Sequence, residues 1–443
     1  MSTPNPLNSS HPPPGVPPTK RWNFGALILD VSCFSTGVAF LEPSAVLPLL
    51  LERLGANGVL IGALAASRSL IFNLIPVFIA YFLQKRVRLK PTLLTVCNVT
   101  RLPVLILPYL IYHSADSLES QKIALWTTVV LLWFWSAGDG MGYAPWMEIV
   151  SRAFDERLRG RFFATTQLVS GSINIGVAAF LVNPVLSATF LPYPANYAFL
   201  ALMYGILMQA SSVGLFLIKE PPAPVHAEPE TTHLSLFGYL RSLPGAAKGN
   251  PNFAKLLRVQ LLLAAGTACQ PFYVIYAKDY FHLTDDWGGK YQVLLAISGM
   301  GILPFIVYVT EKRGMASAIR FVGWVVLLTP IYALTLGRLS PTMFGGVFLL
   351  MGGSLGWGLW MAVSQYLLAD APPAKRPLFI ALMNLVSVPI ALYPTLGGLL
   401  VQHTHLYSVS GVPLLFVLTA LVVSIGVYFI SSLPERKPDA ASR

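Results

Sequence analysis

Long, nearly uncharged apolar runs recur along this 443-residue chain. A helix needs about 20 mostly apolar residues to cross a hydrocarbon core roughly 30 Å thick. Lipid admits only helices or closed barrels, because each backbone polar group must be satisfied within the protein. The runs are too long and continuous for strands, so the sequence predicts an all-α integral membrane protein. The twelve expected spans are 24–50, 58–83, 91–113, 123–149, 162–188, 196–218, 253–277, 291–310, 317–337, 342–368, 378–401 and 412–432.

Composition excludes several classes of function. Hydrophobic residues make up 55% of the chain and charged residues only 11%, whereas a soluble globular chain carries about 25% charged residues. A soluble enzyme, a disordered chain and a nucleic-acid-binding module are therefore excluded. Cys33, Cys97 and Cys269 lie in apolar runs without a CxxC pair, which favours packing over metal or disulfide chemistry. No HExxH-type cluster supports an integral-membrane enzyme, and we expect no metal and no cofactor.

The net charge of +11 is distributed unequally between the two predicted membrane surfaces. With the N-terminus in the cytoplasm, 23 Lys and Arg residues lie on the cytoplasmic side, 5 on the opposite side and 2 within spans. Cytoplasmic loops of membrane proteins carry such an excess of Lys and Arg. The charge therefore predicts a multi-pass protein of the cell (inner) membrane with both termini in the cytoplasm, and no nucleic-acid partner.

Six predicted spans lie on either side of a longer polar segment, which indicates two halves. Short matches support a repeat: Gly142 to Met147 in the fourth span resembles Gly356 to Met361 in the tenth. Parallel six-span halves are one known transporter architecture. The expected organisation is a disordered cytoplasmic tail (1–21), an N-terminal six-helix bundle (22–218), a cytoplasmic central loop (219–252), a C-terminal six-helix bundle (253–432) and a second cytoplasmic tail (433–443).

These features resemble the major facilitator superfamily over about residues 22–435. The resemblance rests on the two halves, on basic loops after spans two and eight, and on Arg157-Leu-Arg159-Gly160-Arg161 after span four. The loop Tyr81 to Lys90 keeps the basic residues of the family signature but lacks its acidic residue and both glycines. The resemblance implies two pseudo-symmetric six-helix bundles that rock around a central site lined by spans 1, 4, 7 and 10. The expected cytoplasmic gate loops carry Lys85, Arg86, Arg159, Arg161 and Arg376.

Five ionisable residues fall inside predicted spans, all in the N-terminal half: Asp30, Glu42, Arg68, Arg101 and Asp139. Insertion of a charged side chain at the centre of a membrane helix costs about 2.5–3.5 kcal/mol, so each of these residues is expected to have a structural or functional role. Arg101 and Asp139 each lie about eleven residues, or roughly 16 Å, from the cytoplasmic ends of their spans, which allows them to pair. Glu42 and Arg68 form a second possible pair in the outer half, and Asp30 has no evident partner.

Asp139 lies on a distinctive helical face between two tryptophans. Trp135, Asp139, Gly142 and Trp146 follow the spacing i, i+4, i+7, i+11, which predicts a carboxylate between two indoles with room for a ligand. Such aromatic walls suit an amphipathic small molecule or a sugar. The further cavity residues that we expect are Trp357, Trp360, Gln270, Tyr273 and Asn384. The alternative is that the charged residues are buried bridges and the tryptophans only fill space.

A buried carboxylate can bind and release a proton as its surroundings change. The sequence therefore favours a secondary active transporter of a small solute, coupled to a proton or another cation, with Asp139 and then Asp30 as the coupling acids. Uptake by symport is preferred slightly over efflux of drugs or metabolites by antiport, because span five lacks the Gly-Pro motif of drug/proton antiporters. A non-transporting receptor or assembly factor of the same fold is the second alternative. We expect a monomer in the lipid bilayer.

Overall fold

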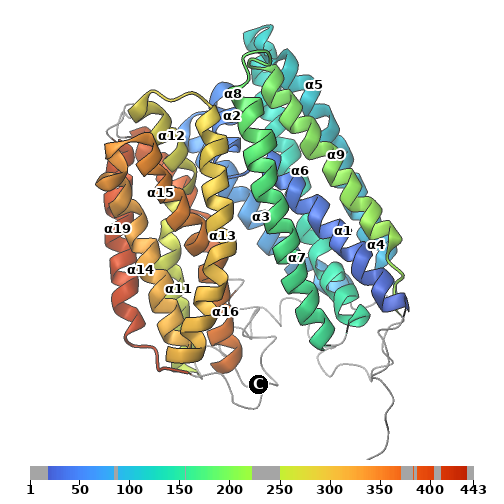
Figure 1. The fold of residues 1–443 in the computed structure, drawn as a ribbon, viewed down its shortest axis with the longest axis vertical. Coiled ribbons are helices and arrows are strands. Elements are labelled where there is room, and N and C mark those ends of the chain that lie inside the picture. The colour runs from blue at the N-terminus through green and yellow to red at the C-terminus, as the bar shows by residue number, and fades with distance from the viewer. Residues whose placement is uncertain are drawn as a thin grey trace, which may run out of the picture.

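The computed structural model describes residues 18–83, 88–154, 156–221, 250–370, 383, 387–403 and 411–436. The regular elements in these residues are all helical. Figure 1 shows two groups of helices side by side, one blue to green and the other yellow to red. The two groups correspond to the two predicted halves of the sequence.

Nine α-helices form the N-terminal group, with short irregular helical turns between some of them. They are α1 (Pro18–Phe40), α2 (Leu47–Arg53), α3 (Gly58–Leu83), α4 (Lys90–Arg101), α5 (Leu107–Tyr112), α6 (Leu118–Ala153), α7 (Glu156–Val177), α8 (Asn183–Ser187) and α9 (Ala195–Leu217). The turns are η1 (Leu102–Ile106), η2 (His113–Ala115) and η3 (Ala178–Val182).

The C-terminal group contains the remaining described helices. They are α11 (Pro251–Leu263), α12 (Gln270–Phe281), α13 (Asp286–Arg313), α14 (Met315–Leu334), α15 (Pro341–Met351), α16 (Leu359–Asp370), α18 (Tyr393–His403) and α19 (Gly411–Ile430). Three irregular turns join some of these helices: η4 (Ala264–Cys269), η5 (Leu336–Leu339) and η6 (Gly352–Gly358).

Polar caps at several helix starts explain where the helices begin. The Ser117 hydroxyl accepts a hydrogen bond from Ser120 N at 3.0 Å at the start of α6. Asn250 and Ser340 cap α11 and α15 in the same way, and a proline follows each as the first helical residue. These side chains satisfy backbone N–H groups that have no partner inside the helix, and proline has no N–H to satisfy. The caps therefore explain why these three helices begin at the residues observed.

Nine described helices or helix pairs are long and apolar enough to cross a membrane. The remaining predicted spans correspond to α3, to α6 and to the segment that contains α18. Helix α3 covers 58–83 as predicted, and α9 lies within one residue of 196–218. The apolar runs thus predicted most helix boundaries closely.

The first span differs from its prediction at both ends. Helix α1 begins at Pro18, so the tail is shorter than expected and Lys20 and Arg21 lie in the first turns of the helix. It ends at Phe40 rather than continuing to 50, and α2 starts only at Leu47. Pro43 falls in this break, and proline cannot donate the hydrogen bond that a continuous helix needs.

Two spans of the C-terminal group, the seventh and the tenth, are interrupted by irregular helical segments. The seventh span consists of α11, the tight turns of η4 and α12, and Pro271 lies at the start of α12. The tenth span contains the wide π-helical segment η6 between α15 and α16. Its counterpart α6 is continuous over 36 residues. The repeated sequence motif therefore lies in a regular helix in one half, whereas in the other half it begins inside η6 and ends in α16.

The second predicted tail is ordered over its first residues. Leu433 is buried, and the Glu435 carboxylate accepts a hydrogen bond from Ala316 N at 2.9 Å and from the Ser317 hydroxyl at 2.9 Å. Arg436 O accepts one from Met315 N at 2.8 Å. Residues 433–436 therefore pack against the C-terminal bundle and cap the first residues of α14.

The two groups of helices meet along α3 with α18 and along α13 with α7 and α8. Gly62 of α3 lies directly against the Pro394 backbone of α18, and Gly398 lies against the Gly58 carbonyl, so a side chain would overlap at either position. Both contacts involve the first turns of α3, which follows α2 along the chain, and α2 is labelled toward the top of Figure 1. Glycine thus permits the two bundles to approach closely there.

Candidate functional site

Three side chains from different helices form a buried polar network in the N-terminal bundle. Arg101 Nη2 lies 3.3 Å from Asp139 Oδ1, and both side chains are less than a tenth exposed. This is the ion pair that their equal depth predicted. Arg101 Nη1 also donates a hydrogen bond to the Ser211 hydroxyl at 3.0 Å. Because Arg101 ends α4, where Pro103 interrupts the regular helix, its side chain reaches α6 and α9 together.

Asp30, for which no partner was evident from sequence, belongs to the same network. Its carboxylate accepts a hydrogen bond from the Ser211 hydroxyl at 2.5 Å and another from Trp146 Nε1 at 2.9 Å. Ser211 is fully buried and connects Asp30 to Arg101. Nothing in the sequence distinguished this serine from the other hydroxyl residues of its span, because buried serines are common between membrane helices.

The predicted Glu42–Arg68 pair is not formed within 4 Å in this structure. The Glu42 carboxylate instead accepts a hydrogen bond from Ser44 N at 2.7 Å, inside the break between α1 and α2. Arg68 Nε lies 3.4 Å from the Ser136 hydroxyl, and its guanidinium lies over the Trp135 ring at 5.1 Å from the centroid. The break after Phe40 turns Glu42 toward its own backbone, which a continuous helix would not have done.

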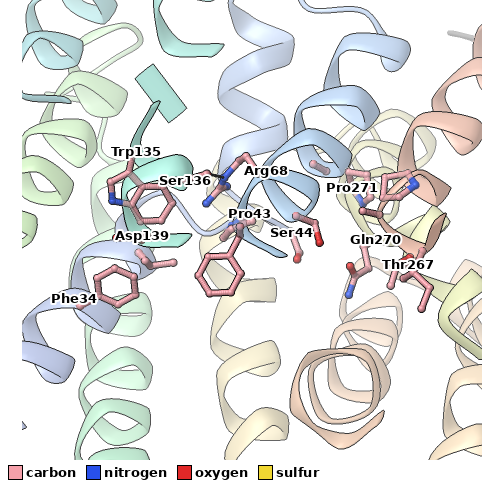
Figure 2. Close-up of a pocket in the computed structure, with 17 residues that line it drawn as sticks. Phe34, Pro43, Ser44, Arg68, Trp135, Ser136, Asp139, Thr267, Gln270 and Pro271 are labelled. Atoms are coloured by element: carbon pink, nitrogen blue, oxygen red, sulfur yellow. Dashed lines mark hydrogen bonds between the residues drawn. The ribbon is translucent and has the colours of Figure 1, made fainter. Parts of the chain in front are cut away.

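A cavity of about 410 Å³ lies between the two bundles and includes part of this network. Figure 2 shows Phe34, Trp135, Ser136 and Asp139 on one side, Arg68, Pro43 and Ser44 near the centre, and Thr267, Gln270 and Pro271 on the other. The other lining residues are Val38, Ala65, Ser69, Phe72, Ile390, Ala391 and Pro394. The wall is therefore largely apolar, with charged groups contributed by the N-terminal bundle.

Trp135, Asp139, Arg68 and Gln270 were predicted for this region and line the cavity. Trp135 also stacks on Phe34, with 6.0 Å between the ring centroids. The indole Nε1 of Trp135 is buried and has no hydrogen-bond partner among the described residues. Phe34 was missed by sequence reasoning, although it lies one helical turn after Asp30 and so on the same face of α1.

Three other predicted cavity residues lie elsewhere. Trp146 donates to Asp30 and contacts Phe162, so Asp139 is not held between two indoles. Tyr273 is buried against Phe416, with ring centroids 4.7 Å apart. Trp360 is 56% exposed on the bundle surface. These predictions were wrong because a membrane helix that is apolar on every side has no amphipathic periodicity, so the sequence does not show which side faces the cavity.

Several predicted residues cannot be placed. Asn384, Arg376, Lys85 and Arg86 lie outside the described residues, as does the side chain of Trp357. Arg159 and Arg161 lie near the start of α7, where Arg159 is half-buried and Arg161 is exposed. Among the described residues, no three His, Cys, Asp or Glu side chains gather where they could hold a metal ion.

A cluster of ion pairs joins the two bundles at the end opposite to the start of α1. Arg53 Nε lies 2.8 Å from Asp285 Oδ2, Lys278 Nζ lies 2.8 Å from Glu52 Oε2, and the Tyr197 hydroxyl donates to Asp285 at 3.2 Å. The hydrogen bond to Asp285 raises the pKa of Arg53, which keeps its guanidinium charged. Arg53 and Lys278 are two of the five basic residues that the charge distribution predicted for the side opposite the cytoplasm, and their pairing was not predicted.

The arrangement defines a class of protein: a multi-pass helical membrane protein with a largely apolar cavity between two bundles, into which a few charged and polar groups point. The family model of the Major Facilitator Superfamily matches residues 29–388. The chain belongs to the Major Facilitator Superfamily, and it is a secondary transporter of that non-enzymatic family. No curated protein matches the sequence.

Solved structures of transporters share the fold over nearly the whole chain. An auto-inhibited POT family peptide transporter matches with a TM-score of 0.67 and 12% identity, over 94% of this chain and 98% of that one. The nucleoside transporter NupG matches with a TM-score of 0.67 and 11% identity, over 94% of this chain and 99% of that one. A bacterial homologue of the human lysosomal transporter Spinster, inward-facing and unoccupied, matches with a TM-score of 0.65 and 12% identity, over 95% of this chain and 98% of that one. These similarities show the twelve-helix fold.

Proposed function

We propose that this protein moves a small amphipathic solute across the membrane by alternating access, coupled to protons. The observation that carries the proposal is a mismatch of charge. Asp30, Glu42 and Asp139 lie with only two guanidiniums, Arg68 and Arg101, in the interior of the described N-terminal bundle. Unpaired charge is costly in a low-dielectric interior. One additional positive charge, supplied by a proton, would balance the network.

Asp139 is the proposed site of that proton. It lines the cavity and is also the ion-pair partner of Arg101, so solute and proton meet at one carboxylate. Asp30 is the second candidate, since it connects to Arg101 through Ser211. Protonation of Asp139 would weaken its attraction to Arg101, and the helices α4 and α6 that carry the two side chains would then be free to shift.

The apolar wall supports an amphipathic solute. Phe34, Phe72 and Trp135 offer aromatic surface, while Arg68 and Gln270 offer polar contacts. Such a combination of a mostly apolar wall with few polar groups is typical of small-molecule pockets. The C-terminal bundle would supply neutral contacts through Thr267 and Gln270.

The membrane orientation belongs to the same proposal. The excess of Lys and Arg favours cytoplasmic termini in the cell inner membrane. The ion pairs around Asp285 would then close the outer side, and the structure would represent an inward-facing monomer. Uptake by proton symport is favoured over proton-driven efflux only by the missing Gly-Pro motif of span five.

The decisive experiment uses proteoliposomes with an imposed pH gradient and a solute found by a thermal-shift screen. We expect Asp139→Asn to lose uphill accumulation while it retains counterflow of labelled solute down its own gradient. Asp116→Asn, which changes an acid exposed on a loop, is the matched control. Uphill accumulation by Asp139→Asn would refute the assignment.

Two further outcomes separate the alternatives. Accumulation driven by an inward proton gradient indicates symport, whereas extrusion driven by that gradient indicates antiport and efflux. Binding without any counterflow in the wild-type protein would show a receptor or assembly factor of the same fold.

A further inference from the structure

A second cavity, separate from the central one, lies between the beginnings of α1 and α7. Its volume is about 440 Å³, and its lining includes Lys20, Arg21, Phe24, Arg161, Thr165 and Leu168. Both helices begin at the same end of the molecule, at the bottom of Figure 1. Residues far apart in sequence are thus brought together at one surface, and three of the side chains are cationic.

Two of the three cations that line this cavity come from different helices, Arg21 from α1 and Arg161 from α7. Among the residues that the structure describes, the lining includes no carboxylate. Arg21 and Arg161 are exposed, and neither makes an ion pair with any residue that the structure describes. Like charges that converge from two helices repel one another unless an anion lies between them. The cavity therefore favours an anionic ligand with oxygen acceptors, for which arginine is well suited.

The position of the cavity relative to the bilayer indicates where the anion comes from. The candidate spans, assigned from helix length and composition, begin at Thr19 and at Arg161. We take these starts as the edge of the hydrocarbon layer, which puts the three cationic side chains at its boundary. Leu168, seven residues further along α7 and so roughly 10 Å deeper, is 61% exposed in the same cavity. A headgroup would meet the cations while its acyl chain covers this apolar wall. A soluble phosphate compound has no chain to cover it.

We propose that the cavity between α1 and α7 is a binding site for an anionic phospholipid such as phosphatidylglycerol. Arg21 and Arg161 bind the headgroup phosphate, Lys20 adds attraction, and the acyl chain lies along Leu168 and Phe24. Basic cavities between membrane helices on the cytoplasmic side bind anionic headgroups in this way. The site is independent of the transported solute, because its lining shares no residue with that of the central cavity.

Native mass spectrometry of the full-length protein in detergent tests this site. The probes are phosphatidylglycerol and phosphatidylcholine with the same acyl chains, and glycerol 3-phosphate as the soluble counterpart. We expect the wild-type protein to retain phosphatidylglycerol selectively. The double substitution Arg21→Gln with Arg161→Gln should weaken this binding by roughly thirtyfold, from the attraction that each basic residue exerts on an anionic lipid.

The matched control removes two cations from another helix end at the same surface, by Lys312→Gln with Arg313→Gln. It should leave the binding of phosphatidylglycerol unchanged. The proposal is overturned if the Arg21 and Arg161 variant elutes as folded protein and still binds phosphatidylglycerol like the wild type. It is also overturned if glycerol 3-phosphate displaces the lipid, because the site would then serve a soluble phosphate ester.

Discussion

Asp285, the residue before α13, accepts a hydrogen bond from Arg53 Nε of α2 at 2.8 Å, and Lys278 Nζ of α12 lies 3.4 Å from its other carboxylate oxygen. The Asp285 carboxylate thus lies between two cations, Arg53 of the N-terminal bundle and Lys278 of its own C-terminal bundle. Asp285 is 6% exposed and Arg53 is 43% exposed. The buried acid, rather than the exposed arginine, is therefore the group whose removal should matter most.

Asp285→Asn should favour opening of the side on which α2 meets α12. It removes contacts worth up to about 1 kcal/mol each where one partner is exposed, and one or two kcal/mol change a population roughly fivefold to thirtyfold. The measurement is the rate at which a membrane-impermeant thiol reagent, added outside, labels Ser44→Cys in the central cavity. Lys290→Gln is the control, since its ion pair with Asp286 lies within α13. Equal labelling rates for Asp285→Asn and the control would show that the cluster does not hold the bundles together.

Arg101→Leu should destabilise the N-terminal bundle strongly. Removal of one partner of a buried ion pair leaves an uncompensated charge and costs about 3–5 kcal/mol. The double variant Arg101→Leu with Asp139→Leu should recover part of this loss, because neither charge then remains alone. Thermal unfolding in detergent measures both variants. An unfolding temperature of Arg101→Leu equal to the wild type would contradict the assigned role of this pair.

Trp146→Phe should reduce transport without unfolding the protein. Phenylalanine keeps an aromatic ring near Phe162 but cannot donate the hydrogen bond to Asp30, a bond to a charged group worth about 1.5–3 kcal/mol. Trp360→Phe makes the same chemical change on the exposed surface and is expected to have no effect on transport. Initial transport rates in proteoliposomes compare the two. The prediction fails if both variants behave alike.

Gly62→Val should weaken the contact between α3 and α18. Its side chain would overlap with the Pro394 backbone, and overpacking costs about 1–3 kcal/mol. Gly176→Ala in α7 is the control, because a methyl group there meets nothing within 4 Å. Alanine also suits a helix better than glycine, so that variant should be as stable as the wild type or more stable. The unfolding temperatures in detergent distinguish these outcomes.

Counting residues along the predicted spans identified one of the two expected ion pairs correctly and the other incorrectly. The Arg101–Asp139 pair followed from equal distances to the membrane surface, because a helix rises uniformly. The predicted Glu42–Arg68 pair is not formed, because the helix is broken at 41–46. Beyond Phe40, the number of residues therefore no longer gives the distance along the helix axis. Pro43 signalled the break, but proline alone does not distinguish a kinked helix from an interrupted one.

The aromatic residues show a second limit. Trp146 and Trp360 occupy equivalent positions of the sequence repeat, yet one binds a buried carboxylate and the other is exposed. Internal similarity in sequence thus did not extend to the surroundings of each side chain. Ser211 and Phe34 have no charge or unusual spacing, so only the packing of α9 and α1 against α4 and α6 identifies them.

Among the described residues that line the central cavity, the charged ones all belong to the N-terminal bundle, and the wall contributed by the other bundle is neutral. Under the proposed mechanism, the proton-binding carboxylate therefore belongs to the N-terminal bundle, while the C-terminal bundle adds only neutral contacts to the solute. If that mechanism holds, substitutions at Thr267 or Gln270 would change the contacts offered to the solute while Asp139 and Arg101 keep theirs. The choice of cargo could then be altered from the C-terminal bundle without altering the proton-binding group.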